Sequence, residues 1–159
     1  PTIAKAIVKT DGTVIKEFKP EKLGVIPATK ETIKFLHGSL REVVISGTGA
    51  GAFNSFPIPI SGKTGTAQVF GRNPNGSAKA DTSWFASYGP TNKPRFAVVM
   101  MVSQGGFGSS ISAVGARDIY AALYGVSGGK VDPAKEIFPN GVPTKLPKVD
   151  PKNAKLVKP

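Results

Sequence analysis

The chain has 159 residues and a formal net charge of +11, with 21 Lys and Arg against 10 Asp and Glu. This length suits one domain or part of a larger one, and a content of 40% hydrophobic and 19% charged residues is that of a globular protein. No stretch approaches the ~18 apolar residues of a membrane-spanning helix. The absence of Cys excludes a disulfide framework and thiol chemistry.

The basic excess raises the question of a polyanionic partner such as a nucleic acid. Of the 21 basic residues, 17 are Lys, and seven of these fall within residues 130–159. The sequence contains no basic helix and no strand in which aromatic and basic residues alternate. We interpret the charge as a solvated surface with a basic tail and predict no nucleic-acid partner. Attraction to anionic envelope polymers fits the same charge.

The chain opens with the pattern of a hairpin followed by a helix. Residues 3–9 and 13–18 are strand-like and flank Asp11-Gly12, which is a strong turn signal between two such runs. Residues 28–46 carry apolar side chains at helical spacing, and Thr29 is the predicted N-cap.

The end of this predicted helix is rich in glycine. Because Gly47-Thr-Gly-Ala-Gly51 follows a helix rather than a strand, it predicts a C-cap and a flexible connection, not a phosphate-binding loop. His37 lies on the helix without a second His, a Cys or a carboxylate cluster nearby. We therefore predict neither a metal site nor a catalytic role there.

The most informative segment is Ser61-Gly-Lys-Thr-Gly-Thr-Ala67, which Gln68 follows. A cation and two hydroxyls suit an anionic, peptide-like ligand, and Gly65 lets such a ligand approach the backbone closely. Gly and β-branched residues after the Lys favour a strand. Gly62-Lys63-Thr64 does not end a P-loop, because that motif needs Gly at position 57, which is Pro, and a helix after the Lys. Taken alone, the triplet is more often ordinary strand and turn.

Two further strands and a helix follow a polar loop at 71–81. Residues 82–88 and 95–103 are joined by a turn too short for a parallel crossover, so we expect an antiparallel meander. The run 95–103 is almost continuously apolar, which predicts a strand buried on both faces. We expect the helix 111–124 to cover the sheet, Trp84 and Phe85 to pack between sheet and helix, and Lys93 and Arg95 to solvate the turn.

The composition changes at Ser127. Pro and Lys dominate from there on, which predicts an extended tail or linker. Ser127-Gly-Gly-Lys130 fits a Ser-x-x-Lys pattern, but that spacing activates a serine only on a helix. Two glycines in a Pro-rich segment do not form one, so we assign this pair no catalytic role.

Taken in order, these motifs resemble the transpeptidase domain of class B penicillin-binding proteins. The resemblance covers roughly residues 1–125 and includes Gly47-Thr-Gly, Ile60-Ser-Gly-Lys63, Lys63-Thr-Gly-Thr-Ala-Gln68, the Trp84-Phe85 strand, the apolar strand and the closing helix. It implies an α/β fold of the α+β type, with an antiparallel sheet covered by helices and only its C-terminal half present. Residues 1–126 would belong to that domain and residues 127–159 would be a Pro/Lys-rich extension.

The family's other two motifs, Ser-x-x-Lys and Ser-x-Asn, are expected upstream of Pro1. The chain has no Ser-x-Asn, and its only Ser-x-x-Lys is the tail copy. The resemblance therefore implies that the nucleophilic serine lies in a preceding half and that this chain alone is a fragment without its nucleophile.

The resemblance also implies roles for the site residues. Lys63 would supply positive potential and assist proton transfer, and Thr64 and Thr66 would bind the substrate carboxylate. The backbone N–H of Thr66 would be one oxyanion-hole donor. Ser61, Gly65 and Gln68 complete the expected substrate-binding set, with no cofactor and no metal.

The implied activity is D,D-transpeptidation of D-Ala-D-Ala stem peptides through an acyl-enzyme that β-lactams also form. Implied partners are the upstream half of the domain and cell elongation or division proteins. The implied location is extracytoplasmic, with a membrane anchor upstream. Two alternatives remain: a serine β-lactamase, and a non-catalytic module of the same fold that binds β-lactam or peptidoglycan.

Overall fold

The computed structural model describes residues 4–19 and 21–141. The described residues divide into two compact units, one within residues 4–27 and the other formed by residues 28–141. The first contains an antiparallel hairpin of β1 (Ala6–Val8) and β2 (Val14–Glu17). The carboxylate of Asp11 accepts a 2.8 Å hydrogen bond from the Thr13 N–H, and this bond lowers the pKa of Asp11. The predicted hairpin is confirmed.

The second unit begins with helix α1 (Lys30–Ile45), which Thr29 caps as predicted. The Thr29 hydroxyl accepts a 3.1 Å hydrogen bond from the Thr32 N–H and so satisfies a backbone donor of the first turn. The flexible connection expected after this helix is wrong in part. Residues Ala50–Phe53 form a helical turn, α2, because Ala52 and Phe53 are buried in the core.

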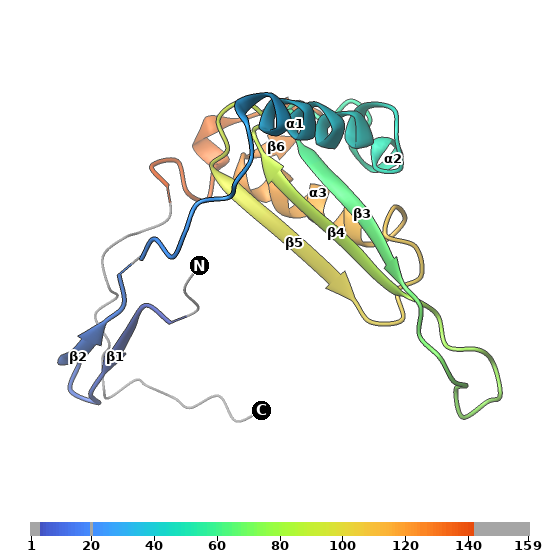
Figure 1. Cartoon of the computed structure of the whole chain (residues 1–159), viewed down its shortest axis with the longest axis horizontal. Coiled ribbons are helices and arrows are strands. Elements are labelled where there is room, and N and C mark those ends of the chain that lie inside the picture. The colour runs from blue at the N-terminus through green and yellow to red at the C-terminus, as the bar shows by residue number, and fades with distance from the viewer. Residues whose placement is uncertain (1–3, 20, 142–159) are drawn as a thin grey trace. The chain divides into compact units, whose positions relative to one another are not determined.

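Three antiparallel strands form the sheet in the order β3-β4-β5, as expected for a meander. They are β3 (Ser61–Ala67), β4 (Thr82–Gly89) and β5 (Phe96–Val102). Helix α3 (Ser112–Leu123) packs against β4 and β5 on one face, and α1 crosses the sheet near the start of β3 (Figure 1). The loop 71–81 joins β3 and β4 at the opposite end.

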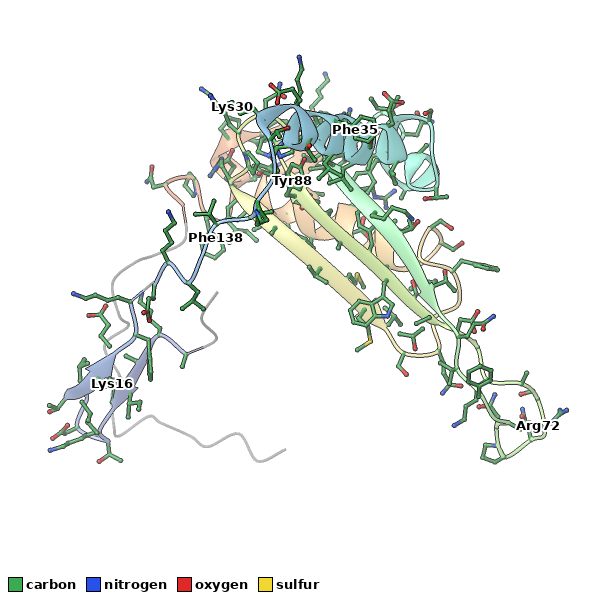
Figure 2. All side chains as sticks on the ribbon, in the orientation of Figure 1. Lys16, Lys30, Phe35, Arg72, Tyr88 and Phe138 are labelled. Atoms are coloured by element: carbon green, nitrogen blue, oxygen red, sulfur yellow. The ribbon has the colours of Figure 1, made fainter. Side chains whose placement is uncertain are left out.

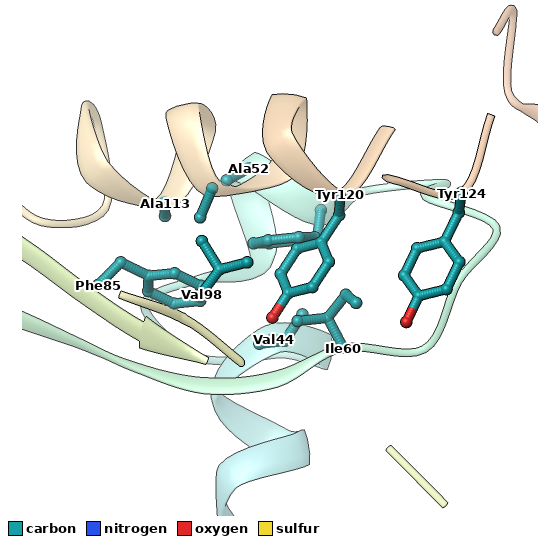
Figure 3. Packing of buried hydrophobic residues seen from close by; sticks show 10 residues of the cluster. Val44, Ala52, Ile60, Phe85, Val98, Ala113, Tyr120 and Tyr124 are labelled. Atoms are coloured by element: carbon teal, nitrogen blue, oxygen red, sulfur yellow. The ribbon is translucent and has the colours of Figure 1, made fainter. Parts of the chain in front are cut away.

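The core lies between α3, the start of β3 and the end of α1 (Figure 3). Phe85 and Tyr120 are fully buried, and Val44 of α1 reaches the same cluster. Buried hydroxyls also join sheet to helix: the Ser83 and Ser112 side chains lie 2.7 Å apart, and the Ser87 and Tyr120 hydroxyls 3.1 Å apart. The sheet and α3 therefore share one packed interface.

The other face of the sheet differs from the prediction. Val99 and Met101 are 65% and 52% exposed, so the expectation that this strand is buried on both faces is wrong. Its side chains alternate, and only those on the α3 side, such as Val98, are covered. Trp84 is 39% exposed on the open face and does not pack between sheet and helix, whereas Phe85 does.

The segment after α3 is also more ordered than predicted. Strands β6 (Val126–Ser127) and β7 (Lys130–Val131) form a hairpin, and a 3₁₀ turn (η1, Pro133–Lys135) follows. An extended tail from residue 127 is therefore wrong for these residues; residues 142–159 lie outside the described part. Ser127 and Lys130 face each other across the hairpin, not on a helix.

Arg95 holds this segment against the sheet instead of solvating the turn. Its guanidinium pairs with Glu136 at 3.3 Å and donates a 2.7 Å hydrogen bond to the carbonyl of Phe138. It also lies over the rings of Phe96 and Tyr124. The guanidinium of one arginine thus links the start of β5, the C-cap of α3 and the chain that follows.

One charged hydrogen bond ties α1 to the sheet. The Arg41 guanidinium donates a 2.7 Å bond to the carbonyl of Ile60, a fully buried residue immediately before β3. We expect Arg41→Met to lower the free energy of unfolding by about 1.5–3 kcal/mol, the range for a hydrogen bond to a charged group. Urea unfolding followed by circular dichroism measures this loss.

The matched control is Arg117→Met, because among the described residues Arg117 forms an ion pair only with its neighbour Asp118 at the surface. A surface ion pair of this kind contributes about 0–1 kcal/mol. Equal losses in the two variants would contradict the role given to Arg41.

Tyr124 makes the free energy of unfolding depend on pH in the alkaline range. Burial raises the pKa of its phenol to about 12, although the nearby positive charge of Arg95 acts to lower that pKa. An unfolded tyrosine ionises near pH 10, so between about pH 10 and 12 the unfolded state loses its proton first, and stability falls as pH rises. We expect Tyr124→Phe, which also loses the 2.8 Å bond to the Gly89 carbonyl, to be less stable at pH 8 but to show a shallower decline. Urea midpoints measured from pH 8 to 11.5 test this, and parallel declines would contradict it.

Candidate functional site

The residues singled out in the sequence lie on β3, an outer strand of the sheet. Within the described residues β3 pairs only with β4, so its other edge has no strand partner. Thr64 lies opposite Phe85 and Lys63 opposite Ala86. Because side chains alternate along a strand and Phe85 faces the core, Lys63 lies on the open face of the sheet.

Lys63 provides a cation at this edge. Its side chain is exposed, and Nζ donates a 2.7 Å hydrogen bond to the carbonyl of Thr64 and lies 3.4 Å from the Thr64 Oγ1. In the described part of the chain, Lys63 belongs to none of the ion pairs. Its charge is therefore not neutralised by a carboxylate and remains available to an anionic ligand.

Thr64 is held by a residue that precedes it by 16 positions. Its Oγ1 lies 2.6 Å from the Oγ1 of Thr48, which follows α1. The sequence placed Thr48 in a glycine-rich helix end and gave it no role of its own. In the sequence, only the Gly47-Thr-Gly motif drew attention to this turn, and it does not show which later residue the Thr48 hydroxyl contacts.

Gly65 and Thr66 are contacted from the α3 side by the loop that follows β5. The Gly108 N–H lies 3.5 Å from the Thr66 Oγ1. A Cβ on Gly108 would lie 2.5 Å from the Gly65 carbonyl oxygen and 3.0 Å from its nitrogen. The backbone of this loop therefore sets the position of β3 where the ligand is expected, and sequence reasoning gave no sign of it.

Ser61 and Gln68 occupy the two ends of the segment. Ser61 is fully buried and its hydroxyl lies 2.9 Å from the Thr91 hydroxyl, which argues against the predicted contact with substrate. Gln68 is exposed just beyond the last residue of β3. Lys63, Thr64, Gly65 and Thr66 are thus consecutive on an exposed to half-buried stretch of β3, where the register places Thr64 and Thr66 on the Phe85 side of the strand and Lys63 on the other.

No metal centre is found among the described residues. No group of three or more His, Asp or Glu side chains is close enough there to hold an ion. The ring of His37 lies 5.5 Å from that of Tyr88, a labelled residue in Figure 2, and so packs on an aromatic ring. No helix in the described part is both long and apolar enough to cross a membrane.

Residues 1–121 match the family model of the penicillin binding protein transpeptidase domain. Peptidoglycan D,D-transpeptidase MrdA of Haemophilus influenzae is 37% identical over 82 residues, which cover 46% of this chain and 13% of that protein. Penicillin-binding protein PbpB of Mycolicibacterium smegmatis is 37% identical over 112 residues, covering 64% and 16%. The chain thus spans less than a fifth of either relative.

Solved structures of penicillin-binding proteins also superpose on this chain. Pseudomonas aeruginosa PBP2, in complex with WCK 5153, superposes with a TM-score of 0.59 at 27% identity, over 77% of this chain and 25% of that one. Penicillin-binding protein 2B of Streptococcus pneumoniae superposes with a TM-score of 0.58 over 73% and 20% of the two chains, and its 22% identity supports the fold alone. The expected mixed fold, with helices on an antiparallel sheet, is confirmed.

The contact of Gly108 with β3 gives a prediction. Gly108→Ala places a methyl group against the backbone of Gly65 and Trp84, so we expect β3 to shift and stability to fall by about 1–3 kcal/mol, as for overpacking. Urea unfolding measures the loss. Gly38→Ala is the control, because Gly38 lies inside α1 with open space around it and alanine there favours the helix. A Gly108→Ala variant as stable as the wild type would contradict this account of the loop.

Proposed function

The chain belongs to the penicillin-binding protein transpeptidase domain family, and on that premise we propose that it supplies the Lys63 strand to a serine D,D-transpeptidase active site. The observation that carries the proposal is the strand itself. The Lys63 cation has no carboxylate partner among the described residues, and two threonine side chains lie next to it, Thr64 half-buried and Thr66 exposed. In the same part of the chain, the outer edge of this strand has no strand partner. The reaction would cross-link peptidoglycan stem peptides ending in D-Ala-D-Ala.

The chemistry proceeds in two steps. A serine in a preceding half of the domain attacks the carbonyl of the penultimate D-Ala, an ester forms, and the peptide bond breaks with release of protonated D-Ala. The amine of a second stem peptide then attacks the ester, forms the cross-linking amide and returns the proton to the serine. A β-lactam acylates the same serine in the first step, and its ring amide bond is the bond that breaks.

Four residues of β3, and Gln68 just beyond it, have roles in this proposal. Lys63 gives positive potential to the terminal carboxylate and assists proton transfer, while the hydroxyls of Thr64 and Thr66 bind that carboxylate. The Thr66 N–H stabilises the oxyanion of the tetrahedral intermediate together with the N–H of the serine. One such donor contributes about 10²–10³ in rate. Gly65 leaves room for the peptide, and Gln68 lines the far end.

The substrate would bind as an added strand along the outer edge of β3. Edge strands recruit peptides in this way, with backbone hydrogen bonds for affinity and side chains for specificity. The absence of a strand partner at this edge, among the described residues, supports this mode. Ser61 keeps β3 attached to the Thr91 turn and is assigned a structural role.

The wider setting follows from the same proposal. The chain would act with the serine-bearing half outside the cytoplasmic membrane, anchored by a segment upstream, and with cell elongation or division proteins. A solved structure of a peptidoglycan synthase complex that coordinates polymerization and crosslinking matches with a TM-score of 0.56, which supports a partner in peptidoglycan synthesis. Residues 1–126 would form the transpeptidase part and residues 127–159 a C-terminal extension.

Labelling by fluorescent penicillin tests the proposal. We expect the longer protein that contains this chain to form a stable covalent adduct, and Lys63→Ala to slow its formation by about 10²-fold, as for loss of one electrostatic contribution. Gel fluorescence over time measures the rate, with Lys79→Ala, on the 71–81 loop, as the matched control.

The alternatives give different outcomes. Rapid loss of the label by hydrolysis would indicate a serine β-lactamase. No adduct with a folded protein, together with reversible binding, would indicate a non-catalytic module and would overturn the proposal.

A further inference from the structure

The contact between Thr48 and Thr64 joins two parts of the site that lie far apart in the sequence. The two hydroxyl oxygens are 2.6 Å apart, and the Lys63 Nζ is 3.4 Å from the Thr64 oxygen. Thr48, Thr64 and Lys63 therefore form one chain of polar groups that ends at the open side of β3. Thr48 makes no other hydrogen bond in the described structure through its side chain.

The backbone around Thr48 is fixed by the end of α1. The Gly47 N–H donates to the Glu42 carbonyl at 3.0 Å, and the Gly49 N–H donates to the Val43 carbonyl at 2.8 Å. A Cβ on Gly47 would lie 2.9 Å from the Val43 Cα, so this turn requires glycine there. The Thr48 hydroxyl is thus presented to β3 from a rigid helix terminus.

The hydrogen-bonding capacity of a hydroxyl determines what this contact does. A threonine hydroxyl donates one hydrogen bond and accepts two. When the Lys63 ammonium and the Thr48 hydroxyl both donate to Thr64, the Thr64 proton is left to point outward. A carboxylate only accepts hydrogen bonds, so it binds best to Thr64 in this arrangement, and a chain of such bonds strengthens each member.

We propose that Thr48 is a positioning residue that orients the Thr64 hydroxyl as a donor toward the carboxylate of the substrate or of a β-lactam. This rests on the proposed function above. Thr48 does not touch the ligand; it acts through Thr64. Its contribution is therefore specific to ligands that carry a free carboxylate at this position.

The test compares acylation by penicillin and by a penicillin methyl ester in the longer protein that contains this chain. We expect Thr48→Val, which keeps the shape and removes the hydroxyl, to slow acylation by penicillin about three- to tenfold, the effect of one lost hydrogen bond. Acylation by the ester should change less than about twofold on the same scale. Thr48→Ser should restore the wild-type rate.

Two further variants separate positioning from folding. In a Thr64→Val background, Thr48→Val should have no further effect, because the group that it orients is gone. Thr32→Val is the matched control: its hydroxyl lies 3.2 Å from that of Thr29 at the other end of α1, and its removal should leave both rates unchanged. Thr48→Ala replaces Thr48→Val if the latter is unfolded by circular dichroism.

The outcomes are distinct. A wild-type protein that penicillin does not acylate overturns the proposed function, and this inference with it. Normal acylation of the wild type, with equal slowing of penicillin and ester in Thr48→Val, overturns the inference alone, because Thr48 would then act on the fold. Unchanged acylation by penicillin in Thr48→Val overturns it as well.

Discussion

The geometry of the site depends on how the end of α1 is attached to the start of β3. The Arg41 guanidinium holds the Ile60 carbonyl at 2.7 Å, and the Thr48 hydroxyl meets Thr64 at 2.6 Å. A charged hydrogen bond to a buried residue is stronger than a neutral one, so it fixes the entry to the strand. The neutral pair then sets the orientation of a single hydroxyl. Together they hold β3 without occupying its outer edge as another strand would.

The two faces of the sheet divide structural and chemical roles. On the α3 face, Phe85 is fully buried, and paired hydroxyls such as Ser83 with Ser112 satisfy the polar groups that burial would otherwise leave unpaired. On the other face Trp84 and Lys63 remain accessible. Because a strand alternates its side chains, the packing of Phe85 in the core is what directs Lys63 outward. The core thereby determines where the cation lies.

The sequence predicted what is encoded locally. Thr29 and Asp11-Gly12 act on neighbours within three residues, so cap and turn follow from the chain itself. The Lys63 strand was found through residue types and a family resemblance. Long-range contacts were not predictable: Arg95 reaches Glu136, 41 residues away, and Gly108 lies over Gly65. The exposure of Val99 was missed because an apolar run does not show whether a second layer covers it. The contact of Thr48 with Thr64 joins residues 16 positions apart, and no local pattern in the sequence predicts it.

An exposed edge strand with a lysine admits a simpler explanation, since charged residues on edge strands prevent pairing with other chains. That explanation accounts for the Lys63 charge but not for its surroundings. A lysine that only prevents strand pairing does not require the hydrogen-bonded hydroxyls of Thr48 and Thr64 beside it. It also does not require the contact of the Gly108 backbone with Gly65. Here Nζ donates to Thr64, Thr64 meets Thr48, and Gly108 contacts Gly65 and Thr66 from the α3 side. Polar groups held in place by the fold reduce the cost of ordering them, as binding of an anionic strand at the open edge requires.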